Sequence, residues 1–148
     1  MNAPTRRMAA VAWAGLLATP VLFVGVTLAA APPRGMRSPE LSGMFFWMAA
    51  AVAGLGLALS RLLPPRIRAS GGGPRDAVAF TRLLVAWAIL EGAAMFPLVA
   101  ELVTGDATLY VVSAVPFLAL ALLIPTQERW DAYAVQPLDS PGPDRRVR

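Results

Sequence analysis

The chain has 148 residues, of which 57% are hydrophobic and 15% are charged. Soluble domains average about 45–50% apolar and about 25% charged residues, so this composition excludes an ordinary soluble enzyme. The sequence contains no Cys and no His, which removes the usual zinc and haem ligands, disulfides and the acid–base group that titrates near neutral pH. All 13 basic residues are Arg, so lysine-dependent Schiff-base and P-loop chemistry are excluded as well.

These absences predict a protein that is not an enzyme, with no catalytic residue, no metal site and no cofactor. The net charge of +4 at pH 7 raises the question of nucleic-acid binding. The Arg residues, however, form short clusters beside apolar runs and do not line one solvated face with aromatic residues between them. We therefore expect a lipid bilayer as the main partner, and no nucleic acid.

Four apolar runs follow one another along the chain, at about residues 8–31, 41–60, 80–103 and 107–125. Each run is close to the ~20 residues that a helix needs to cross a hydrocarbon core of ~30 Å. Segments rich in Pro and Gly separate the runs, and none of the runs alternates as a strand would. The sequence thus predicts an all-α integral membrane protein with four transmembrane helices arranged as two hairpins.

The Arg distribution predicts the orientation of these helices, because cytoplasmic loops carry the excess of positive charge. Only Arg34 and Arg37 fall between the first two runs, and the other basic residues lie before the first run, around the second loop or in the tail. Both termini are therefore expected in the cytoplasm, in a multi-pass protein of the inner (cytoplasmic) membrane. A cleaved signal peptide is the competing interpretation, but the first run is too long for one and Pro32 follows the cleavage point.

The domain organisation follows from the same pattern. Residues 1–126 form the membrane domain, and residues 127–148 form an interfacial anchor followed by a mobile cytoplasmic tail. Trp130 and Tyr133 are the aromatic residues expected at headgroup level in the anchor. The remainder of the tail is rich in Pro, Asp and Arg and has no core to join.

Glu91 is the acidic residue that lies deepest in an apolar run. If Arg82 marks the cytoplasmic interface, Glu91 lies roughly 13 Å further along the helix, near the middle of the bilayer. A carboxylate at this depth is expected to take up a proton or to bind a cation. Pro97 has no N–H group for the carbonyl of Ala93, so that carbonyl becomes a candidate partner for the proton or cation. Glu101, near the end of the same run, is expected to be solvated at the opposite interface.

A structural role for Glu91 is equally open. A protonated carboxyl group can bond across helices to Ser113, Tyr110, Thr19 or a free carbonyl, and such bonds contribute only about 0.6 kcal/mol on average.

The short motif Val-Ala-Trp-Ala occurs at residues 11–14 and again at 85–88, which suggests an internal duplication with Leu17 in the place of Glu91.

Residues 74–99 locally resemble the second helix of subunit c, the proteolipid of F-type ATP synthase rotors. In that family a polar, Arg-containing cytoplasmic loop precedes a helix whose central Asp or Glu binds the transported proton or sodium ion. Glu91 and Pro97 match the carboxylate and the Gly or Pro about six positions after it. The rest of the chain departs from the family, because the glycine-repeat helix is reduced to Gly54 and Gly56 and the fourth helix has no carboxylate.

Two functions are therefore expected. The first is a non-catalytic structural or accessory subunit of a larger membrane complex, associated with other subunits or with itself. The alternative is a proteolipid-like protein that binds a proton or a cation at Glu91.

Overall fold

The computed structural model of the protein describes residues 3–29, 38–67 and 75–134, and all of its regular structure in these ranges is helical. The predicted all-α fold is thereby confirmed. The elements in chain order are α1 Ala3–Ala29, η2 Pro39–Leu41, α2 Ser42–Leu62, η3 Pro64–Arg66, α3 Arg75–Thr104, α4 Thr108–Leu122 and α5 Gln127–Ala134. The tail from residue 135, predicted to be mobile, and Arg34 and Arg37 lie outside the described residues.

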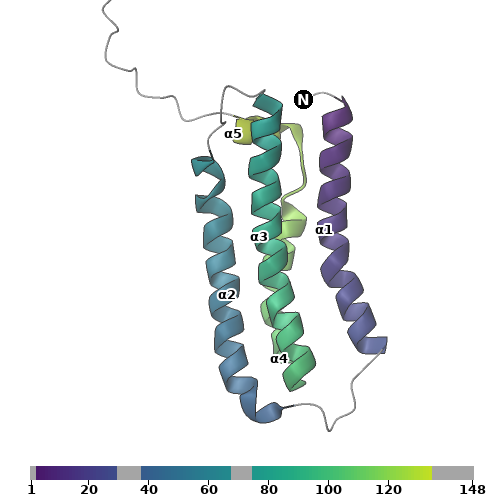
Figure 1. Ribbon diagram of the computed structural model, residues 1–148, viewed down its shortest axis with the longest axis vertical. Coiled ribbons are helices and arrows are strands. Elements are labelled where there is room, and N and C mark those ends of the chain that lie inside the picture. The colour runs from purple at the N-terminus through teal and green to yellow at the C-terminus, as the bar shows by residue number, and fades with distance from the viewer. Residues whose placement is uncertain (1–2, 30–37, 68–74, 135–148) are drawn as a thin grey trace, which may run out of the picture.

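Helix α3 is the centre of the molecule. It contacts α1, α2, α4 and α5, and in Figure 1 it runs between α2 and α1 with α4 behind it. Half of the most apolar stretch of α3 is buried, against 11% for α1 and 17% for α2. The two outer helices therefore expose most of their apolar surface, as helices facing lipid do.

In the part of the chain that the structure describes, three helices are long and apolar enough to cross a membrane, namely α1, α2 and α3. The helices extend beyond the apolar runs that predicted them: α1 begins near residue 3 instead of 8, and α3 begins at Arg75 instead of residue 80. Hydropathy marks the apolar part of a helix, whereas the backbone hydrogen bonds continue into polar turns on either side. We call the end of the bundle where α3 begins the Arg82 end, and the end where it finishes the Gly105 end.

The fourth predicted helix, 107–125, is shorter than expected. Helix α4 ends at Leu122, and α5 follows at an angle of 91° after a break of four residues that contains the buried Pro125. At 1.5 Å per residue, α4 alone is roughly 22 Å long, less than the ~30 Å of a hydrocarbon core. The chain thus has a fourth span only if α4 and α5 together count as one broken span.

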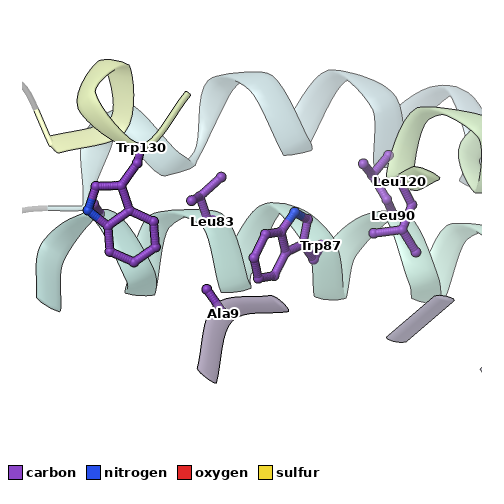
Figure 2. Close-up of a cluster of buried hydrophobic side chains, with 7 residues drawn as sticks. Ala9, Leu83, Trp87, Leu90, Leu120 and Trp130 are labelled. Atoms are coloured by element: carbon purple, nitrogen blue, oxygen red, sulfur yellow. The ribbon is translucent and has the colours of Figure 1, made fainter. Parts of the chain in front are cut away.

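The largest core cluster lies towards the Arg82 end. Figure 2 shows its labelled side chains, which come from four helices: Ala9 of α1, Leu83, Trp87 and Leu90 of α3, Leu120 of α4 and Trp130 of α5. All of these side chains are at most 1% exposed. Packing in this cluster fixes how α3 is rotated and shifted relative to its neighbouring helices. It therefore also fixes the position of Glu91, one turn after Trp87.

Candidate functional site

Glu91 lies in the middle of α3, roughly 24 Å from its first residue and roughly 20 Å from its last. It follows Trp87 by one turn and precedes Leu98 by two turns, so the three residues share the side of the helix that packs towards α1. Its side chain is half-buried, while Ala88 and Gly92 beside it are exposed. Within the described residues the carboxyl group has no hydrogen bond and no ion pair.

Ala93 lies on a different side of α3, against α2. A methyl group added to Gly56 would collide with the Cβ of Ala93 and would lie 3.6 Å from the carbonyl oxygen of Ile89. Gly56 and Ala93, both buried, therefore allow the α2 and α3 backbones to approach closely, as small residues do in membrane helix pairs. The side chain of Ala93 serves helix packing.

Pro97 is fully buried. The Ser113 hydroxyl of α4 donates a 2.7 Å hydrogen bond to the carbonyl of Ala94, one residue after the carbonyl that lost its donor to Pro97. Ser113 is 4% exposed, so this bond is shielded from solvent. Ser113, a predicted partner of Glu91, therefore bonds a backbone carbonyl one residue after Ala93 and not the Glu91 carboxyl group.

The other two expected partners of Glu91 lie elsewhere. Thr19 is exposed on α1, and its hydroxyl donates to the Gly15 carbonyl within the same helix at 3.2 Å. Tyr110 lies on α4 and lines a cavity together with Leu98 and Ser113. Within the described residues Glu91 has no hydrogen bond to Thr19 or Ser113, so the structure does not assemble the predicted set of partners.

Glu101 corrects an expectation. It was predicted to reach solvent because it lies near the end of α3, yet its side chain is only 7% exposed. The position of Glu101 around the helix decides this outcome, because it lies two turns after Ala94 on the side of α3 that packs against α4. The position of Glu101 along the sequence alone did not reveal that its side chain is buried.

Arg82 is the buried charge that sequence reasoning placed at the membrane interface. It is 2% exposed, and its guanidinium group donates to the carbonyl of Ile67 from Nε at 3.1 Å and from Nη2 at 2.9 Å. A third bond, from Nη1, reaches the carbonyl of Tyr133 in α5 at 2.8 Å. Arg82 therefore ties the end of the η3 turn and the end of α5 to α3.

The break between α4 and α5 is capped by donors from three helices. The indole of Trp13 in α1 donates to the Leu120 carbonyl at 3.1 Å, and the indole of Trp87 in α3 donates to the Leu123 carbonyl at 3.0 Å. Arg129 of α5 donates to the Leu122 carbonyl. The last carbonyls of a helix lack the backbone donor of a following turn. These side chains bond three of them, and the Leu120 carbonyl also accepts the Leu123 N–H. Trp13 and Trp87, the two Trp residues of the repeated Val-Ala-Trp-Ala motif, thus both donate to carbonyls at the end of α4.

Helix α5 packs inward. Trp130 is 1% exposed, donates its indole N–H to Asp76 at 3.1 Å and packs against the ring of Phe80, with 6.5 Å between ring centroids. The indole therefore contacts protein, whereas the sequence suggested a residue at headgroup level. The amphipathic character of a Trp side chain fits both environments, and only the fold distinguishes them.

The turn at the Gly105 end is tightly fixed. Gly105 adopts φ 74°, the left-handed conformation that ends a helix and favours glycine, and its N–H bonds the Glu101 carbonyl. Asp106 accepts hydrogen bonds from the hydroxyls of Ser42 and Thr108 and from the Thr108 amide. The Ser42 bond, followed by the Thr108 bonds, lowers the pKa of Asp106 below its ordinary value of 3.8.

A cavity of about 240 Å³ lies between α1, α3 and α4 in the half of the molecule nearer the Gly105 end. Its lining consists of Pro20, Val21, Val24, Leu98, Tyr110, Ser113, Ala114 and Phe117. No group of three or more His, Cys, Asp or Glu side chains that could hold a metal occurs in the described part of the chain.

The chain matches no protein-family model, no curated protein and no solved structure. The class that the fold itself defines, over the described residues, is an all-helical protein with three, or up to four, helices long and apolar enough to cross a membrane.

Proposed function

We propose that the chain is a small non-catalytic integral membrane protein that works as an accessory subunit of a larger membrane complex. The observation that supports this most directly is the half-buried Glu91, which lies midway along α3 without a bond inside the described chain. In hydrocarbon, an unpaired carboxyl group is costly and favours a partner on a neighbouring helix. The proposal places both termini in the cytoplasm and the chain in the inner membrane.

The surface beside Glu91 suits close contact with another helix. Ala88 and Gly92 are exposed on α3, and a methyl group added to Gly92 would have no neighbour within 4 Å. Small residues let transmembrane helices approach closely enough for a polar side chain to bond across the interface. Figure 1 shows that α3 is the central helix, flanked by α1 and α2, so a partner helix at this face would contact the core of the molecule directly.

Purification of the tagged protein in mild detergent tests the proposal. We expect a partner to co-purify in fixed stoichiometry with the wild type and to be lost in Gly92→Leu, because the leucine side chain blocks close approach. Gly54→Leu is the matched control, because Gly54 on α2 is equally open. A monodisperse lone monomer, or equal loss in both variants, would contradict an accessory role through this face.

A second candidate function is favoured by the same carboxyl group and by the local resemblance to the rotor proteolipid. In this alternative, Glu91 binds a proton or a cation near the bilayer midplane. Hydrophobic carbodiimides react with protonated carboxyl groups in the membrane, so labelling is expected at Glu91 and is expected to decline as pH rises.

Glu128→Gln, at an exposed position of α5, is the control that keeps this labelling, and Glu91→Gln is the variant that loses it. Labelling that is absent at every pH would eliminate the alternative while leaving the accessory role untouched. Protection of Glu91 by added sodium would identify a cation as the bound species.

A further inference from the structure

The basic residues of the molecule lie towards one end of the bundle. Every Arg in residues 3–29, 38–67 and 75–134 lies towards the Arg82 end, where α1 and α3 begin and α2 finishes in Figure 1. The Gly105 end carries, in the same ranges, the acidic residues Glu40, Glu101 and Asp106 and no basic one. The described part of the chain therefore has a basic end and an acidic end.

Arg61 and Arg66 lie where α2 finishes, on either side of a short apolar segment. Arg61 belongs to the last turn of α2, and Arg66 is the last residue of η3 and of the membrane-length stretch Ser42–Arg66. Both arginine side chains are exposed, and Leu62 and Leu63 between them are 55% and 37% exposed. Aliphatic and basic side chains that lie so close together suit the boundary between hydrocarbon and headgroups.

The backbone of this segment is held in place. The Arg66 amide donates to the Leu63 carbonyl at 2.9 Å, and Pro64 between them is buried. The Ile67 carbonyl, directly after η3, accepts two hydrogen bonds from the Arg82 guanidinium group of α3. A segment that is already ordered loses little conformational freedom when it binds a ligand.

The guanidinium groups of Arg61 and Arg66 are open to a ligand. Within the described residues neither group has a hydrogen bond or an ion pair, whereas Arg82 and Arg129 bond backbone carbonyls of the chain. A planar guanidinium group matches a phosphate group through two parallel hydrogen bonds. The cytoplasmic leaflet supplies phosphate groups with net negative charge at the level of the headgroups.

We propose that Arg61 and Arg66 bind the phosphate groups of anionic phospholipids, with Leu62 and Leu63 against the adjoining part of the acyl chains. A headgroup is favoured over an acidic protein surface because Arg66 ends a membrane-length stretch and the two leucines beside it are exposed. The assignment rests on the proposed location in the membrane, but it does not depend on a partner subunit at the α3 face beside Gly92.

Native mass spectrometry of the full-length protein tests the assignment. The protein is released from micelles that contain equal amounts of phosphatidylglycerol and phosphatidylcholine, and the retained lipids are counted. We expect the wild type to retain phosphatidylglycerol in preference. Each arginine beside an anionic headgroup contributes roughly fivefold in affinity, so the preference should fall roughly fivefold in Arg61→Gln or Arg66→Gln and roughly 25-fold in the double variant.

Arg145→Gln/Arg146→Gln is the matched control, because it removes the same charge from the tail, outside the described residues. Its preference for phosphatidylglycerol is expected to equal that of the wild type. Inorganic phosphate, added at constant ionic strength, distinguishes a lipid headgroup from a free anion and is expected to leave phosphatidylglycerol bound. Circular dichroism and gel filtration establish that each variant is folded.

Four results would overturn the assignment. They are equal retention of the two lipids by the wild type, an equal loss of preference in the tail control, displacement of phosphatidylglycerol by inorganic phosphate, and a crosslink to a protein in native membranes from a benzophenone at position 66. The membrane location itself is tested by alkaline carbonate. Release of the protein from membranes would refute the proposed function, whereas a retained protein without lipid preference refutes only the lipid assignment.

Discussion

The close contact of α2 and α3 at Gly56 and Ala93 gives the sharpest prediction. Replacing Gly56 with Ala forces the new methyl group into the Cβ of Ala93, and the nearest backbone atom, the Ile89 carbonyl oxygen, leaves little room to shift. Overpacking of this kind costs about 1–3 kcal/mol. Alanine recovers about 0.5–1 kcal/mol through its better helix propensity. We therefore expect a net loss of about 1–2 kcal/mol in the free energy of unfolding.

Gly54→Ala is the control, because Gly54 lies two residues away on the same helix with nothing within 4 Å of the added methyl group. It should be neutral or slightly stabilising, since only the propensity gain applies. The assay is unfolding of the detergent-solubilised protein by increasing SDS, followed by far-UV circular dichroism. Equal stability of the two variants would refute the close contact.

A double variant makes the reasoning stricter. Removing the opposing methyl group in Gly56→Ala/Ala93→Gly should restore most of the lost stability, and residues in direct contact typically couple by about 0.5–3 kcal/mol. Ala94→Gly is the control for the rescue, because Ala94 is the adjacent buried position and its carbonyl bonds α4. If Ala94→Gly rescues as well as Ala93→Gly, the effect is general loosening of α3 and not relief of one collision.

Three further predictions concern the polar contacts at the two ends of the bundle. Trp87→Phe removes the donor to the Leu123 carbonyl and should cost about 1–2 kcal/mol in the same SDS assay. Arg82→Met removes the bond to the Tyr133 carbonyl of α5 and the two bonds to the Ile67 carbonyl, and should cost about 3 kcal/mol. It should also shift the fluorescence of the α5 indole, Trp130, to longer wavelength. The pKa of Asp106 is lower in the folded state, so its contribution to stability is present above about pH 4 and is lost as pH falls through that lowered pKa. Thermal unfolding between about pH 2 and pH 7 should therefore show a steeper acid loss for the wild type than for Asp106→Asn.

Distinct results would contradict each of these. A Trp13→Phe/Trp87→Phe variant as stable as the wild type would show that the break after α4 does not depend on indole donors. Unchanged Trp130 fluorescence in Arg82→Met would mean that other contacts hold α5. Parallel pH profiles for the wild type and Asp106→Asn would show that Ser42 and Thr108 do not favour the ionised carboxylate.

The helices could be predicted from sequence because hydropathy integrates over about twenty residues, and single errors average out. The break after Leu122 could not, because Leu123 and Ile124 are as apolar as the helix before them. Proline at position 125 signalled an end, but nothing local signalled a right-angled turn followed by a helix that packs inward. Trp130 carries the same ambiguity, since an indole suits both a headgroup layer and a protein core.

The connections of the candidate site could not be predicted. Glu91 lies midway along α3, but its direction depends on how α3 is rotated against its neighbours. That rotation is set by packing, for example of Trp87 and Leu90 in the core cluster. Arg82 shows the same limit, because a charge near the start of an apolar run looks like an interfacial residue until the Ile67 and Tyr133 carbonyls are placed beside it.

The capping of the α4–α5 break has a consequence for synthesis. The donors come from α1, α3 and α5, so they span nearly the whole length of the chain. The end of α4 is therefore fully capped only after α1 and α3 are in place and α5 has been translated. A nascent chain stopped before Arg129 would carry an incompletely capped helix end.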